Sequence, residues 1–175
     1  MSIASRIRTI PHYPREGIMF RDITTLLQDA EGFGVMIGSL VERYRDQPID
    51  KVAAVEARGF ILGAPLAWAL GAGFVPIRKR GKLPAGVIGR DYALEYGMDR
   101  LEIHTDAISP GERVLLVDDL IATGGTAEAA AGLVRDLGGH IVACAAAINL
   151  PDLGGTQRLE AQGIPTFWLT EFSGH

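Results

Sequence analysis

The chain has 175 residues, of which 47% are hydrophobic and 22% charged, a composition typical of one folded globular domain. No apolar run approaches the ~20 residues that a membrane-spanning helix needs, and the formal charge of −4 gives no electrostatic reason to expect nucleic-acid binding. The N-terminal residues lack the apolar region of a signal peptide, and the single cysteine, Cys144, excludes a disulfide framework within the chain. These features favour a cytoplasmic protein with no membrane or nucleic-acid partner.

The first fifty residues contain one weak and one strong helix signal. Three isoleucines at helical spacing predict a short helix over residues 2–10. A loop rich in apolar and charged side chains is expected over residues 14–23. From Asp29, a candidate N-cap, apolar side chains follow the period of an amphipathic helix that ends before Pro48.

From residue 51 onward, short apolar strands alternate with helical segments. A helix over residues 60–70 meets a natural C-cap at Gly71. The next strand contains Pro76, which lacks a ladder donor and therefore predicts an edge strand or a bulge. This alternation predicts an α/β fold, a parallel sheet flanked by helices. The expected strands are residues 51–55, 74–77, 114–117, 141–148 and 166–169, and the later helices are residues 127–137 and 156–161.

A predicted hairpin follows a basic segment between the strands of this pattern. Residues 78–82 hold four cations in five positions, which is either a solvated turn or a mobile loop that clamps a polyanion. Residues 92–96 and 100–104 alternate in character around a glycine-containing turn, as the two strands of an antiparallel hairpin do. We interpret the basic segment as a clamp and the hairpin as a lid outside the core sheet.

The stretch from Val114 to Thr126 carries the strongest functional signal. Four consecutive apolar residues, expected to form a strand buried on both faces, lead to the acidic pair Asp118 and Asp119. A loop of small residues and then a helix follow. Open α/β sheets bind ligands at the carboxyl ends of their strands, so this layout predicts a ligand site.

The residue types in this stretch indicate a sugar phosphate. Gly124 and Gly125 let backbone N–H groups approach a ligand, and a helix start favours an anion such as phosphate. The acidic pair would repel phosphate but is suited to vicinal sugar hydroxyls or to a metal ion. A phosphate site beside a diol site describes a ribose 5-phosphate. An ordinary turn with two solvated aspartates is the alternative interpretation.

Residues 114–126 resemble the signature of the type I phosphoribosyltransferases, which bind 5-phosphoribosyl 1-diphosphate (PRPP). The resemblance implies that Asp118 and Asp119 hold the ribose hydroxyls. It also implies that the small-residue loop wraps the 5-phosphate with backbone amides. The residues of that loop are Ala122, Thr123, Gly124, Gly125 and Thr126.

Three further stretches resemble the members of this family that use adenine: residues 17–24, residues 56–60, and residues 78–84 together with 92–97. The resemblance implies purine salvage, in which adenine and PRPP give AMP and diphosphate. It implies Mg²⁺ bound mainly through PRPP and diphosphate, with no side chain as a direct metal ligand, and a homodimer.

The same resemblance implies one domain over residues 1–175. An N-terminal hood would cover about residues 1–30, and a flexible catalytic loop with the β-hairpin lid would cover about residues 79–105.

Roles for individual side chains follow from the resemblance. Glu95 and Arg78 would be catalytic, with Glu95 handling the proton that adenine loses or relays. Lys79 and Lys82 would join Arg78 in holding diphosphate, and some of these residues could act from a neighbouring subunit. Arg58 would contact diphosphate as well.

The base would be recognised by the hood. Backbone groups of Met19 and Arg21 would read the adenine edge, and Phe20 would help to close the pocket.

Two other functions remain open at this point. The same chemistry could act on another purine base, such as hypoxanthine, guanine or xanthine. A non-catalytic PRPP-binding regulator would be expected to carry a DNA-binding module or to have lost the lid. Neither the Walker A nor the G-x-G-x-x-G pattern occurs in the sequence, and its four histidines show no metal-binding spacing.

Overall fold

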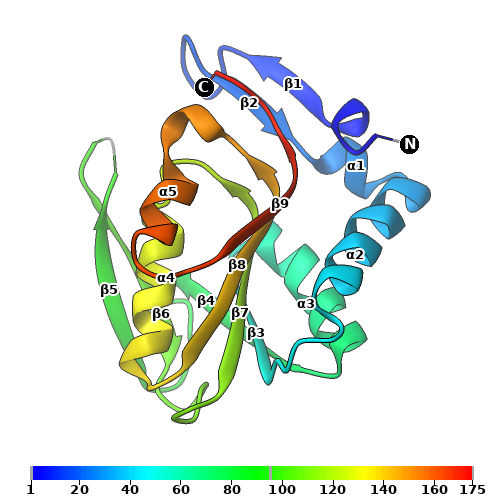
Figure 1. Cartoon of the computed structure of the whole chain (residues 1–175). Helices are drawn as coiled ribbons and strands as arrows, with labels where there is room; N and C mark the ends of the chain where they lie inside the picture. Colours follow the sequence, from blue (N-terminus) through cyan, green and yellow to red (C-terminus); the bar gives the residue numbers. More distant parts are fainter. Residues whose placement is uncertain (1, 95, 175) are drawn as a thin grey trace.

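A computed structural model describes residues 2–94 and 96–174. Its main feature is a seven-stranded sheet in the order β5-β6-β4-β3-β7-β8-β9, beside a separate two-stranded sheet, β1-β2 (Figure 1). Strands β4, β3, β7, β8 and β9 pair in parallel, and β5 and β6 are antiparallel. The bounds are β1 (Arg8–Pro11), β2 (Met19–Asp22), β3 (Lys51–Val55), β4 (Gly73–Lys79), β5 (Val87–Ala93), β6 (Met98–His104), β7 (Arg113–Ile121), β8 (His140–Asn149) and β9 (Thr166–Glu171).

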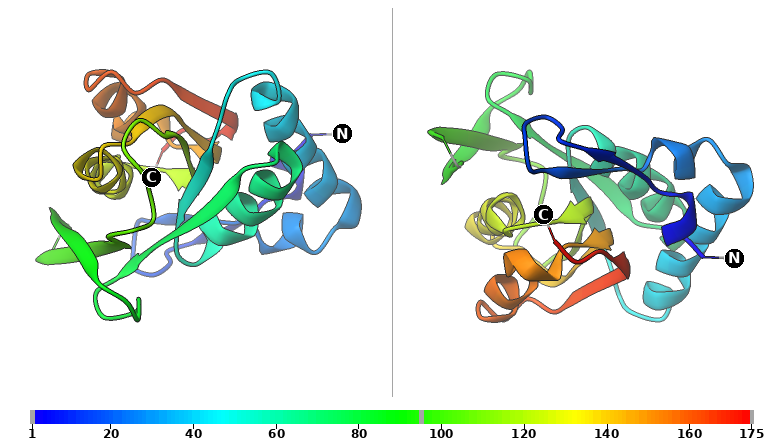
Figure 2. Two further views of the ribbon diagram at one scale, coloured as in Figure 1. Left: turned by 90° about the horizontal axis from the view of Figure 1, so that it is seen from below. Right: turned by 90° about the horizontal axis from the view of Figure 1, so that it is seen from above.

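Helices cover both faces of the parallel part of the sheet (Figures 1 and 2). Along β7, Val114 and Leu116 are buried in a core shared with α4, while Leu115 and Val117 are buried in a core shared with α2 and α3. A strand buried on both faces explains the continuous apolar run. The helices are α1 (Thr24–Leu27), α2 (Ala30–Tyr44), α3 (Arg58–Leu70), α4 (Gly125–Asp136) and α5 (Gly155–Glu160), with short 3₁₀ turns at Ala4–Arg6 and Pro151–Leu153.

Local signals place the start of α2 and the end of α3 where the sequence predicts them. The Asp29 side chain accepts a hydrogen bond from Gly32 N at 3.1 Å and caps α2. Gly71 takes the left-handed conformation, with φ of 68°, directly after α3. No helix among the described residues is long and apolar enough to cross a membrane.

The hood differs from the predicted helix over residues 2–10. Only Ala4–Arg6 is helical, and β1 pairs with β2 in an antiparallel register that places Ile10 opposite Phe20. Three apolar residues at helical spacing are a weak signal, and pairing with a distant strand overrides it. The loop expected over residues 14–23 contains β2 for the same reason.

The hairpin β5-β6 continues the main sheet and does not stand apart from it. Arg78 and Lys79 of β4 pair with Glu102 and Leu101 of β6. Pro76 therefore does not mark an edge of the whole sheet, because β6 covers the end of β4. The ladder to β6 begins only at Arg78, so the free side of β4 faces no strand at Pro76. At Pro76 itself, β4 is therefore an edge of the sheet, as its missing N–H donor predicts.

Candidate active site

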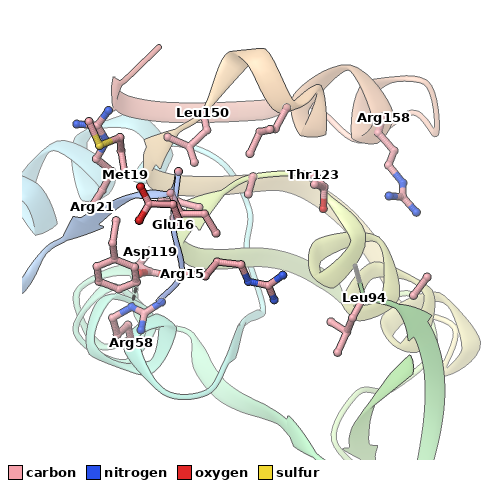
Figure 3. A pocket seen from close by; sticks show the side chains of 17 residues that line it. Arg15, Glu16, Met19, Arg21, Arg58, Leu94, Asp119, Thr123, Leu150 and Arg158 are labelled. Atoms are coloured by element: carbon pink, nitrogen blue, oxygen red, sulfur yellow. Dashed lines mark hydrogen bonds and ion pairs between the residues drawn. The ribbon is translucent and has the colours of Figure 1, made fainter. Parts of the chain in front are cut away.

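A cavity of about 850 Å³ lies at the carboxyl ends of the parallel strands. The hood loop and β2 form one wall, the tip of the β5-β6 hairpin a second, and the segment after β8 a third (Figure 3). The end of β7 and the loop after it form the floor. Four segments distant in sequence thus enclose one space large enough for a small-molecule ligand.

A smaller cavity of about 210 Å³ adjoins the first and is lined by residues 118–127 with Arg58. The loop from Ala122 to Gly124 wraps one side of it and ends in α4. Gly124 has a φ of 88°, which side chains rarely adopt, and so the tight turn requires glycine here. The first turn of α4 leaves backbone donors at this cavity, as an anion site requires.

The acidic pair lies within β7, close to its carboxyl end, and not after the strand as predicted. Arg58 Nε, at the start of α3, donates to Asp119 Oδ2 at 2.5 Å. The Asp118 carboxylate accepts from the amide of Asp119 at 2.8 Å. Burial and the neighbouring charge of Asp119 raise the pKa of Asp118 well above its usual value. One carboxylate is thus paired with a cation, and the other is held where its charge is disfavoured.

Glycines allow the close packing that brings these groups together. A Cβ on Gly59 would lie 3.0 Å from Asp118 Oδ1. A Cβ on Gly155, at the start of α5, would lie 2.8 Å from Ile121 Cγ2 and 2.9 Å from Gly124 N. The small-residue loop is therefore supported from behind by α5.

Comparison with known proteins agrees with this arrangement. The family described as Phosphoribosyl transferase domain matches residues 24–164. The adenine phosphoribosyltransferase of Nitrosospira multiformis is 65% identical over 175 residues, which is all of both chains. This chain belongs to the adenine phosphoribosyltransferases. Members of this family are pentosyltransferases of purine salvage, so the predicted family is confirmed.

Solved structures of adenine phosphoribosyltransferases share the fold. That of Thermoanaerobacter pseudethanolicus has a TM-score of 0.92 at 48% identity and covers 97% of this chain and 98% of its own. That of Saccharomyces cerevisiae, complexed with an imino-altritol bisphosphate and adenine, has a TM-score of 0.89 at 38% identity over 95% of this chain and 96% of its own. The predicted α/β fold is confirmed.

Most of the predicted ligand-binding residues converge on the two cavities. Met19, Phe20 and Arg21 line the larger one from the hood. The Phe20 ring packs edge-on against Tyr13 at 5.1 Å, and the Arg58 guanidinium carbon lies 5.8 Å from the Phe20 ring centre. Five residues line both cavities: Arg58, Asp119, Leu120, Ala122 and Thr123. Asp118, Gly124, Gly125 and Thr126 line the smaller one only.

The cations of the basic segment lie elsewhere. Arg78 Nε pairs with Glu56 Oε1 at 3.1 Å, and Lys79 Nζ donates to Tyr92 OH at 2.7 Å and pairs with Asp99. The Lys82 side chain is exposed. These three described cations line neither cavity.

The proposed acid Glu95 lies outside the described residues. Its neighbour Leu94 lines the larger cavity from the tip of the hairpin (Figure 3).

Sequence reasoning missed several residues that line the larger cavity. Leu150 and Leu153 reach it from the segment after β8, and Arg158 reaches it from α5 (Figure 3). Arg158 Nε donates to Glu128 Oε2 at 2.5 Å. Arg15 of the hood loop also lines the cavity, with its guanidinium carbon 4.7 Å from the Tyr96 ring centre. None of these side chains stands in a recognisable motif, and only the tertiary fold brings them together.

Proposed function

We propose that this chain transfers the 5-phosphoribosyl group of PRPP to adenine, which gives AMP and diphosphate. The observation that carries this proposal is the shared wall between the two cavities. A base in the larger cavity and a ribose 5-phosphate in the smaller one would meet over Asp119 and Ala122, which line both. A nitrogen of the base and C1 of the ribose are then held together, and such positioning is itself a major part of catalysis.

Charge development explains the acidic pair. When the bond from C1 to diphosphate breaks, the electron pair leaves with diphosphate and the ribose becomes electron-poor. Asp118 and Asp119 would hold the ribose hydroxyls and place negative charge beside that ribose. A nitrogen of adenine then forms the new bond to C1 and loses its proton. We assign the handling of that proton to Glu95, and Arg78 is the second residue proposed as catalytic.

The leaving group requires positive charge. Arg58 lies at the shared wall of the cavities, within reach of the diphosphate of a PRPP bound there. We propose that Arg78, Lys79 and Lys82 complete the diphosphate site once the loop closes over the ligand, because they do not line the cavities in this conformation. A closed loop would also exclude water, which would otherwise hydrolyse the reactive C1 centre.

Mg²⁺ fits this site as an ion bound mainly by the substrate. The described residues contain no group of three metal-binding side chains, and the Asp119 carboxylate already forms an ion pair with Arg58. Mg²⁺ typically takes one or two carboxylates and completes its shell with substrate phosphates and water. When bound, the ion would neutralise charge on the diphosphate leaving group.

We propose a homodimer formed through the outer face of α3. Trp68 is 86% exposed and Ile61 is 39% exposed, and the two lie two helical turns apart on a face that also carries Ala64. A tryptophan left so open to water is typical of residues at protein interfaces. We further propose that residues 1–175 act as one domain, with a hood over about residues 1–30 and a flexible catalytic loop and hairpin over about residues 79–105, and that the protein is cytoplasmic.

The test offers purified protein, Mg²⁺ and PRPP with adenine, hypoxanthine, guanine or xanthine separately. We expect nucleotide from adenine alone, because a pocket that pairs with a 6-amino group rejects a 6-oxo base. Product from another base would keep the phosphoribosyl site and overturn the base. Binding of PRPP with no product from any base would favour the regulator.

A further inference from the structure

The segment Phe172–Gly174, here called the clasp, has no role in the reaction described so far. It follows β9 and passes beside β2 of the hood (Figure 1). It therefore connects the last strand of the main sheet with the separate N-terminal sheet. We propose that the clasp positions Arg21, and through it the adenine-reading strand β2. This inference rests on the proposed function.

The clasp holds the Arg21 side chain from two directions. The guanidinium carbon of Arg21 lies 4.4 Å from the centre of the Phe172 ring, which is the geometry of a cation–π contact. Arg21 Nη2 donates to the carbonyl oxygen of Ser173 at 3.5 Å. On the hood side, Arg21 Nη1 donates to Thr9 Oγ1 of β1 at 2.7 Å. The guanidinium is thus fixed between β1 and the clasp.

The clasp is itself fixed to the wall of the larger cavity. Phe172 N donates to the carbonyl oxygen of Asn149 at 3.1 Å, and Gly174 N donates to Asp152 Oδ2 at 2.6 Å. These partners are the chain neighbours of Leu150 and Leu153, which line the cavity. Arg21 lines the same cavity from the hood (Figure 3). The clasp therefore links two walls of the base site.

The hood needs such a link because of its size. Its sheet has two strands and four residue pairs, and a two-stranded sheet by itself is marginally stable in water. Movement of β2 would shift Met19 and Arg21, the residues proposed to read adenine. It would leave the small-residue loop after β7 unchanged, because that loop is supported by α5. Loss of the clasp should therefore affect adenine more than PRPP.

The central test is Phe172→Leu in the full chain, with initial rates of AMP formation measured against each substrate. We expect the KM for adenine to rise about fivefold, the size of effect that loss of one partly exposed cation–π contact allows. The kcat and the KM for PRPP should stay within about twofold, since the phosphate site is not touched. Phe172→Tyr keeps the ring and should keep the wild-type KM for adenine.

Phe167→Leu is the matched control. Phe167 lies on β9, and its ring centre is 5.2 Å from the guanidinium carbon of Arg43 and 6.1 Å from the Tyr44 ring centre. It is the same residue type with a comparable contact to arginine, but it does not line the cavity. Phe167→Leu should lower Tm without changing the KM for adenine.

A double-mutant cycle tests the route through Arg21. If the clasp acts through this side chain, adding Phe172→Leu to Arg21→Met should raise the KM for adenine no further than Arg21→Met alone. Asp152→Ala, which removes an exposed anchor of the clasp, should raise it by a smaller factor and provides a second test if Phe172→Leu does not fold.

Equal and independent effects of Arg21→Met and Phe172→Leu would overturn the proposal. So would an unchanged KM for adenine in Phe172→Leu and Asp152→Ala. In either case AMP formation by the wild-type chain would leave the proposed function intact, whereas no AMP from the wild type would refute the function itself.

Discussion

At the scale of single residues, Asp118 and Asp119 are chemically different although they are neighbours in sequence. Asp119 is paired with Arg58 at 2.5 Å. Asp118 is held by the Asp119 amide, and burial and the adjacent charge raise its pKa. Asp118 is therefore the member of the pair whose charge the fold disfavours.

Replacing both carboxylates by amides should nearly abolish turnover. Asp118→Asn with Asp119→Asn keeps the side-chain shape but removes the negative charge beside the ribose. We expect kcat/KM to fall by about a hundredfold or more, as losses of preorganised electrostatic groups do. AMP formation measures the effect, and an unchanged circular dichroism spectrum serves as the control for folding. Wild-type activity in this variant would refute the site.

Asp118→Asn alone should stabilise the protein at neutral and alkaline pH. The folded state raises the pKa of Asp118, so it binds the proton more tightly than the unfolded chain, and stability is lost as pH rises above the ordinary value of 3.8. Asparagine removes that penalty and keeps an acceptor for the Asp119 amide. Each kcal/mol recovered raises Tm by about 2–4 °C for a chain of this size. Thermal melts at pH 8 should show a higher Tm for the variant, and the advantage should vanish below about pH 4.

At the scale of elements, the small-residue loop depends on a helix, α5, that lies outside the motif in sequence. The start of α5 packs against the loop, and Gly155 N donates to Ala122 O at 3.1 Å. The basic segment differs, since Lys79 and Lys82 lie outside the cavities and would have to move to take the diphosphate-binding role proposed for them. Close packing fixes the small-residue loop, whereas the proposed role of the basic segment requires a change of conformation.

Gly155→Ala should distort the small-residue loop, which is proposed to hold the 5-phosphate. The added methyl would overlap Ala122 O and Gly124 N, both backbone atoms that cannot move without shifting the loop. We expect a higher KM for PRPP and a loss of about 1–3 kcal/mol of stability, typical of overpacking. Gly34→Ala on α2 meets nothing within 4 Å and is the matched control, which should stabilise by about 0.5–1 kcal/mol. Chemical denaturation and PRPP kinetics check both.

Lys82→Ala should weaken the binding of PRPP and diphosphate more than that of adenine. The charge of Lys82 is proposed to meet the diphosphate after closure, whereas adenine carries no charge for it to attract. We expect a KM for PRPP raised about fivefold to tenfold, from loss of one charge-assisted contact. Equal effects on both substrates, measured by substrate-dependence of the rate, would mean that the segment is only a solvated turn.

At the scale of the whole molecule, the helix layer over one face of the sheet leaves apolar side chains of α3 exposed to water. α3 buries Leu62 and Leu66 against the sheet and leaves Ile61 and Trp68 in contact with water. A helix that is apolar on all sides is typically buried. The second covering layer is expected to come from another copy of the chain.

Trp68→Glu should therefore dissociate the dimer. The side chain is 86% exposed, so the fold of one subunit should lose no more than about 0.5 kcal/mol. A buried charge at the interface would disfavour association. Sedimentation of the wild type should give a dimer and the variant a monomer. Val35→Glu, on the exposed side of α2, is the control and should remain dimeric. A monomeric wild type would contradict the proposed assembly.

Elements with local signals, and a candidate site whose residues are contiguous in the chain, could be predicted before the fold was known. The apolar period after Asp29, the cap at Gly71 and the doubly buried run at residues 114–117 depend on neighbours within one or two turns, so they could be predicted. The acidic pair and the small-residue loop are adjacent in the chain, and their chemistry could be inferred together.

Which distant segments meet depends on the assembled fold. β1 forms because β2 pairs with it, against a weak helical spacing. Leu150, Leu153 and Arg158 reach the larger cavity, and Phe172 reaches Arg21, through sheet order and crossing connections. Such contacts join residues up to 152 positions apart. Hydrophobic burial and strand pairing in the assembled fold place them, and no periodicity within a single stretch records it.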